Sequence, residues 1–220
     1  MVTFDDVRNN REIQACIMRS DELLKMADYT EHSFVHAGIV SRTAAKVLED
    51  IGGYSGRDIE LARIAGYVHD IGNMINRNDH AQSGAILAYD ILMRMGMDVE
   101  EATLVASAVG NHDEGTGSAV SPVSAALILA DKADVRYTRV RKDTASKFDI
   151  HDRVNSAVRN STLRIDKEKN QIELKMEIDT EISSVMDYFE IFLQRMLMCR
   201  KSAEFFGMRL RIAANEMRLL

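Results

Sequence analysis

The sequence lacks the features that mark secreted, membrane and nucleic-acid-binding proteins. Its two cysteines, Cys16 and Cys199, lack the paired spacing of a structural zinc site, so we expect free thiols in a reducing cytoplasm. A net charge of -6 gives no basic surface, which argues against general nucleic-acid binding. The longest apolar stretch, 120–130, contains serines and a proline and is too short to cross a membrane. Charged residues near the N-terminus leave no apolar run for an export signal.

Proline is also nearly absent, with one residue in the chain, and apolar residues recur at three- and four-residue spacing. This pattern predicts a mainly α protein with a sizeable core, since 46% of the residues are hydrophobic. Glycines at 52–53, 96 and 115–117 separate several of the helices. The predicted helices span residues 5–27, 31–51, 57–76, 79–95, 98–112, 121–140 and 148–159.

The pattern changes after residue 160, where apolar and polar residues alternate on both sides of the polar turn 166–170. This alternation predicts a small β-hairpin. Two C-terminal helices are expected at 179–200 and 203–218, with stripes of methionine and phenylalanine that indicate a core or a subunit interface, compatible with a homodimer. We therefore divide the chain into a helical domain, 1–160, and a C-terminal part, 161–220, that packs on it.

Histidines and aspartates fall on the buried sides of several predicted helices. A single inward histidine is usually a hydrogen-bonded core residue, but six such groups on different helices are costly to bury without compensation. Divalent cations provide that compensation, because they accept imidazole nitrogens and carboxylate oxygens. The predicted ligands are His36, His69, Asp70, His80, His112 and Asp131.

The ligand count and types indicate the kind of metal centre. Four imidazoles and two carboxylates exceed what one ion takes while keeping a position open for water, but they suit two ions that share Asp70. Because none of the predicted ligands is a cysteine thiolate, we expect divalent transition metals. Iron or manganese is favoured, and zinc, nickel, cobalt or magnesium are the alternatives.

The order of these residues resembles the H…HD…D signature of the HD superfamily. The local sequences agree: H-A-G-I-V-S-R-T-A-A at His36, Y-V-H-D-I-G-N at His69 and L-A-D-K-A-D at Asp131. His80 and His112 resemble the extra ligands of the branches that bind two metals. The resemblance covers about residues 30–140 and implies an HD-domain helical bundle with metal-dependent phosphohydrolase activity.

Two departures limit the resemblance. Asn73 stands where the H-D-I-G-K branches have lysine, and the sequence after Asn111 lacks their G-Y-P, so we disfavour a cyclic-di-GMP phosphodiesterase. His32 lies one turn before His36 and is an alternative first ligand, which we place instead beside the ligands or at the substrate. Asp134, one turn after Asp131, is the corresponding alternative for the last ligand. His151 is assigned to the surface without a role.

The expected reaction is cleavage of a phosphate ester or anhydride by a metal-activated hydroxide, and the favoured substrate is a nucleotide. Asp70, His80 and His112 are the predicted catalytic residues; the two histidines act as acid/base groups if one metal binds. Lys132 is a candidate phosphate contact, as are Arg42, Arg136 and Arg139, although charged helix residues are most often simply solvated. Two rival functions stay open: an HD-type di-iron oxygenase and a non-catalytic nucleotide-binding regulatory module.

Overall fold

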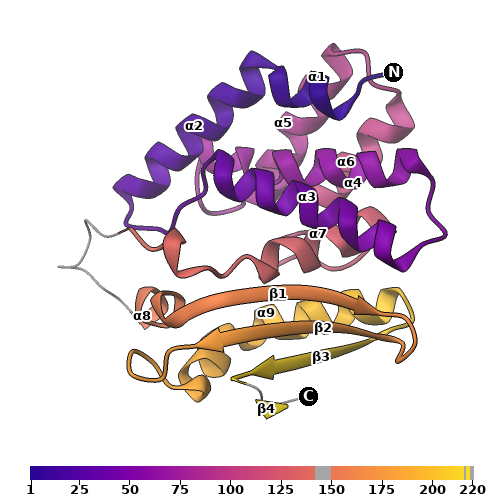
Figure 1. Cartoon of the computed structure of the whole chain (residues 1–220). Coiled ribbons are helices and arrows are strands. Elements are labelled where there is room, and N and C mark those ends of the chain that lie inside the picture. Colours follow the sequence, from indigo (N-terminus) through magenta and orange to yellow (C-terminus); the bar gives the residue numbers. More distant parts are fainter. Residues whose placement is uncertain (142–149, 216, 219–220) are drawn as a thin grey trace.

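A computed structural model describes residues 1–141, 150–215 and 217–218. The N-terminal part is a bundle of α-helices joined by short loops (Figure 1). Its helices are α1 (Phe4–Asn9), α2 (Arg11–Met26), α3 (Phe34–Ile51), α4 (Gly56–Val68), α5 (His80–Arg94), α6 (Val99–Gly110) and α7 (Pro122–Ala133). Two short 3-10 helices, η1 (Ile71–Met74) and η2 (Tyr137–Arg139), follow α4 and α7. The expected mainly α architecture is confirmed.

Capping residues place most helix starts close to the predicted ones and correct one prediction. The single helix expected at 5–27 is two helices, because Asn10 adopts an extended backbone and its side chain accepts hydrogen bonds from the amides of Glu12 and Ile13. Ser33 caps α3, which therefore starts three residues later than predicted. The helices expected at 57–76 and 121–140 end early and continue as η1 and η2.

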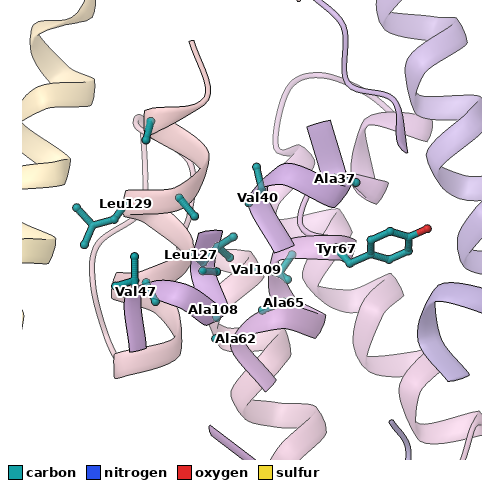
Figure 2. Packing of buried hydrophobic residues seen from close by; sticks show 14 of the residues in the cluster. Ala37, Val40, Val47, Ala62, Ala65, Tyr67, Ala108, Val109, Leu127 and Leu129 are labelled. Atoms are coloured by element: carbon teal, nitrogen blue, oxygen red, sulfur yellow. The ribbon is translucent and has the colours of Figure 1, made fainter. Parts of the chain in front are cut away.

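The core of the bundle is built from small and branched apolar side chains on α3, α4, α6 and α7. Figure 2 shows Val40, Ala65, Val109 and Leu127 of these helices pointing toward one another. All four side chains are fully buried. The alanines allow the helices to approach closely, which brings the polar residues at the helix ends within reach of each other.

The C-terminal part is a four-stranded sheet with one long helix. Its elements are α8 (Ile150–Ala157), β1 (Val158–Asp166), β2 (Gln171–Ile178), α9 (Val185–Phe205), β3 (Arg209–Ala214) and β4 (Met217–Arg218). The strand order is β1-β2-β3-β4. The predicted hairpin is confirmed as the antiparallel pair β1 and β2, with Leu163 opposite Leu174. Of the helix predicted at 148–159, the first two residues lie outside the described part of the chain.

The prediction of a helix at 203–218 is wrong. The α9 helix, which begins at Val185 instead of 179, runs on to Phe205 and stops before Gly207, whose φ of 68° suits glycine. The residues from Arg209 to Ala214 then form β3, which pairs in parallel with β2. Leu210 and Ile212 are buried on the sheet face that α9 covers, so a two-residue alternation existed in this segment.

The α9 helix connects β2 to β3 and packs against both the sheet and α7 (Figure 1). Its buried residues include Tyr188, Phe192, Met196 and Cys199, so the apolar stripe of this helix is part of the core. The division of the chain at residue 160 stays a prediction. Among the described residues, no helix combines the length and the apolarity needed to cross a bilayer.

Candidate metal centre

Three histidines are held in the same way and expose the same nitrogen. The Nδ1 atoms of His69, His80 and His112 lie 3.0, 3.0 and 2.6 Å from the backbone carbonyl oxygen three residues earlier in the chain. Because a carbonyl oxygen only accepts, Nδ1 carries the proton in the neutral ring and Nε2 then keeps its lone pair. Each side chain is therefore fixed in the tautomer that coordinates metal through Nε2.

His36, on the first turn of α3, reaches the same tautomer through a side chain. Its Nδ1 atom donates to Oδ2 of Asp134 at 2.7 Å. Asp134 is buried and also accepts from the guanidinium of Arg136 at 2.6 Å. The alternative of Asp134 as a ligand in place of Asp131 is thus not favoured, because Asp134 orients His36 from the far side of the ring.

The carboxylate of Asp70 lies at the centre of the four histidines. Its Oδ2 atom is 3.1 Å from Nε2 of His69 and 3.6 Å from Nε2 of His36. Its Oδ1 atom is 3.6 Å from Nε2 of His80 and 3.7 Å from Nε2 of His112. One carboxylate oxygen therefore faces each pair of histidines, which is the arrangement of a bridging ligand.

Asp131, near the end of α7, joins the first pair. Its Oδ1 atom is 3.4 Å from Nε2 of His36 and 3.6 Å from Nε2 of His69. The other oxygen, Oδ2, accepts from Nζ of Lys132 at 2.7 Å. Lys132 thereby fixes the rotation of the carboxylate and leaves Oδ1 turned toward the histidines.

The structure thus brings together all six residues that the sequence singled out. Within each of three overlapping groups, the donor atoms lie within 4.8 Å of one another. The groups are His36, His69 and Asp70; His69, His112 and Asp131; and Asp70, His80 and His112. His32 belongs to none of them: its Nδ1 contacts the carbonyl oxygen of Thr30 at 2.7 Å, and its Nε2 is 3.9 Å from Asp70.

Two buried atoms test whether these residues fit a metal. The Nε2 atoms of His36 and His69 are buried and have no hydrogen-bond partner in the described part of the protein. Burying such an acceptor without a partner costs about 1–3 kcal/mol. A divalent cation in reach of both nitrogens and of Asp70 and Asp131 removes this cost, so the residues fit transition ions that bind imidazole and carboxylate.

The electrostatics of the cluster favour positive charge in its first half. Burial alone would lower the pKa of His69, but the carboxylates of Asp70 and Asp131 raise that pKa to about 10. Burial would likewise raise the pKa of Asp70, yet the neighbouring histidines hold it well below its usual range. In the second half, burial lowers the pKa of His80 to about 4, so this imidazole is neutral at pH 7. Neutral imidazole is the form that binds metal.

A cavity of about 240 Å³ opens onto the cluster. Asp70, His80, His112 and Asp131 form its floor. The cationic side chains in its wall are Arg77, Lys132, Arg136, Arg139 and Arg195. Three of the four basic residues that the sequence offered as phosphate contacts thus line the cavity, whereas Arg42 lies on a different hollow, between α1, α3 and α4. The side chain of His151 lies outside the described part.

Sequence reasoning missed several residues that support this site. Asn73 donates to Oδ1 of Asp70 at 2.9 Å and was noted only as a departure from the family pattern. Arg195, on α9, donates to Glu114 at 2.9 Å, and Glu114 lies 3.4 Å from Nζ of Lys132. A signal for Arg195 existed, because it interrupts the apolar stripe of α9 one turn after Phe192. The C-terminal part therefore contributes to the wall of the cavity.

Comparisons with known proteins identify a matching family and similar proteins. Residues 34–139, which contain all six candidate ligands, match the HD domain family. An uncharacterized protein of Methanocaldococcus jannaschii is 24% identical, over 84% of this chain and 80% of that protein. A crystal structure of a predicted HD superfamily hydrolase from an uncultured Thermotogales bacterium is 26% identical, with a TM-score of 0.43, over 57% of this chain and 68% of that one. The archaeal likeness extends beyond residues 34–139.

Proposed function

Since the chain is an HD-domain protein, we propose that it is a metal-dependent phosphohydrolase. It cleaves a phosphate ester or anhydride of a small substrate, and a nucleotide is the favoured substrate class. The observation that carries the proposal is the position of Asp70. Its two carboxylate oxygens face two separate histidine pairs at the floor of a cavity with cationic walls. Few arrangements other than a pair of ions explain so many inward donors around one carboxylate.

The proposed ligands fall into two sets that share Asp70. His36, His69 and Asp131 would hold one ion together with Oδ2 of Asp70, and His80 and His112 would hold the other with Oδ1. Two divalent ions, when bound, supply Lewis acidity toward phosphoryl oxygens and make water acidic enough to act as a nucleophile at neutral pH. Iron and manganese suit the mixed nitrogen and oxygen donors best.

The protein's own contribution is to position groups and to hold protons. Hydrogen bonds from Nδ1 to backbone carbonyl oxygens orient the rings of His80 and His112, so that each presents Nε2 to bind an ion or exchange a proton with water. Lys132 holds Asp131 and lies at the cavity wall, where its ammonium group lowers the cost of bringing phosphate to a carboxylate-rich site. Asn73 donates a hydrogen bond to Oδ1 of Asp70 and thereby fixes the rotation of this carboxylate.

The cavity limits the size of the substrate. A volume of about 240 Å³ lies below the range of about 300–1,000 Å³ that is typical of drug-sized ligands. A single phosphorylated metabolite of mononucleotide size or smaller suits it better than a dinucleoside polyphosphate.

The test is a phosphate-release screen of phosphorylated metabolites with protein loaded separately with Fe, Mn, Zn, Ni, Co and Mg. We expect turnover with at least one nucleotide or small phosphate ester under anaerobic conditions. Asp70→Ala should abolish it, and the matched variant Asp90→Ala, at an exposed site on α5, should not, which excludes a contaminating phosphatase. Oxygen uptake by the iron form without phosphate release would instead assign oxygenase chemistry. Tight nucleotide binding without turnover for any metal would indicate a regulatory module.

A further inference from the structure

We propose that Arg77 is the residue that binds the phosphoryl group in this cavity. The inference rests on the phosphohydrolase function proposed above and adds a substrate-binding residue to it. Arg77 follows η1 and precedes α5, so it lies between the segments that carry Asp70 and His80. It is half-buried and lines the cavity.

The other four cations of the cavity wall are already held by contacts within the protein. Lys132 lies between Asp131 at 2.7 Å and Glu114 at 3.4 Å. Arg195 pairs with the same Glu114 at 2.9 Å. Asp131, Lys132, Glu114 and Arg195 form a chain of alternating charge, whose energy depends on its staying intact. Lys132 can turn to a substrate only by leaving Asp131, and Arg195 only by leaving Glu114.

The two arginines near η2 are committed in the same way. Arg136 pairs with Asp134 at 2.6 Å and with Glu31 at 3.1 Å. Arg139 is buried and donates to the backbone carbonyl oxygens of Glu31 at 3.0 Å and Asp134 at 2.7 Å. Their guanidinium groups therefore hold the 29–36 segment and the end of α7 together. They serve as structural parts of the wall.

Arg77 differs from all four, because among the described residues its guanidinium contacts neither a carboxylate nor a backbone carbonyl oxygen. Its Nη1 atom donates to the neutral side-chain oxygen of Asn73 at 3.1 Å and lies 3.4 Å from Nε2 of His80. Its guanidinium lies 5.6 Å from the ring centroid of Tyr29. Within the described residues, no carboxylate forms an ion pair with it. A partly exposed guanidinium at a cavity wall without a counterion keeps its charge available to an anion that enters the cavity.

The contact with His80 gives a further reason. Because Nδ1 of His80 donates to a carbonyl oxygen, its Nε2 atom is an acceptor, and that lone pair can serve either Arg77 or a metal ion. An ion held by His80 would take up that lone pair and leave the bond to Asn73 as the one hydrogen bond of the Arg77 guanidinium among the described residues. The planar fork of the guanidinium then matches two oxygens of a phosphoryl group. No other described cation stands beside this half of the cluster without a carboxylate partner.

The test measures inorganic phosphate, the expected product, binding to the manganese-loaded protein by calorimetry. We expect Arg77→Met to weaken phosphate binding by about 10- to 100-fold, the effect of losing hydrogen bonds to a charged group. Arg77→Lys should fall between this variant and the wild type, because it keeps the charge and loses the fork. The matched control is Arg94→Met on α5, an exposed residue that pairs with Glu12 at 2.8 Å, and its phosphate affinity should equal that of the wild type.

A second measurement separates binding from a structural role. Manganese affinity of Arg77→Met should be unchanged or higher than in the wild type, because a cation is removed from beside Nε2 of His80. Equal phosphate affinity in Arg77→Met and wild type overturns the role of Arg77, and so does loss of manganese from the folded variant. A wild-type protein that retains manganese and binds no phosphate contradicts the phosphohydrolase function itself.

Discussion

His36 and Asp134 form a buried hydrogen bond of 2.7 Å between Nδ1 of the ring and Oδ2 of the carboxylate. They are ninety-eight positions apart in the chain, so the bond ties the start of α3 to the residue after α7. Burial would raise the pKa of Asp134, but hydrogen bonds from His36 and Arg136 lower it well below its usual range. The carboxylate is therefore ionised at neutral pH and holds the ring of His36 in place.

Asp134→Asn should weaken metal binding without unfolding the protein. An amide in place of this carboxylate reduces the basicity of His36 and allows its ring to turn, which for such outer residues costs about 10- to 100-fold in metal affinity. Titration of the apo-protein with manganese against a chromophoric chelator measures the change. Asp90→Asn, at an exposed position, is the control. An affinity equal to that of wild type would show that the hydrogen bond is irrelevant to the centre.

Metal stoichiometry should depend on which half of the cluster is altered. Asp70→Ala removes the carboxylate that both halves share, so we expect it to lose both ions and turnover while the protein stays folded. His80→Ala affects only the half at Oδ1 and should leave one ion in place. Metal analysis by mass spectrometry after gel filtration counts the ions per chain. Full occupancy in Asp70→Ala, or a single ion in fully active wild type, contradicts the shared site.

Gly72→Ala should destabilise the fold at the site. A Cβ atom at Gly72 would overlap the carbonyl oxygen of His80 and lie 2.5 Å from the amide nitrogen of Gly84. Because both are backbone atoms, η1 and α5 must separate, at a cost of about 2 to 3 kcal/mol. Urea unfolding followed by circular dichroism gives the free energy of unfolding. At Gly56, on the first turn of α4, no atom lies within 4 Å of such a Cβ, so Gly56→Ala should be neutral or stabilise by up to about 1 kcal/mol.

Both cysteines should be inert toward Ellman's reagent in the native protein. Cys199 lies on the buried side of α9, and burial raises the pKa of its thiol to about 12. Burial also raises the pKa of Cys16. At pH 8 the reactive thiolate is therefore scarce and shielded. We expect almost no absorbance change until urea unfolds the chain, when two thiols per chain should react. Rapid labelling of the folded protein would be incompatible with this packing.

The metal donors were predictable because their spacing follows that of the apolar core. His36 lies on the face of α3 that also carries Val40 and Ala44, and all three are buried. A helix that buries such a face necessarily brings its polar member to the interior. The sequence also contained both members of the bond between His36 and Asp134, but no local pattern indicates a contact between residues so far apart.

The end of the chain was harder to predict because tertiary pairing determines its structure. The segment from Arg209 to Ala214 contains leucine, isoleucine and alanines that are compatible with a helix as well as a strand. The β2 strand decides the outcome by offering its edge, with Ile172 opposite Leu210. Arg195 was missed for a related reason, since its partner Glu114 belongs to a loop on the other side of α7.

The crossover through α9 has a consequence for how the protein matures. A ribosome delivers every candidate donor, from His36 to Asp131, before it delivers Phe192 and Arg195. The nascent bundle can therefore take up its ions while the pocket is still open to the medium. The part of the cavity wall that α9 contributes is added only afterwards, when β3 has paired with β2 and α9 packs against α7.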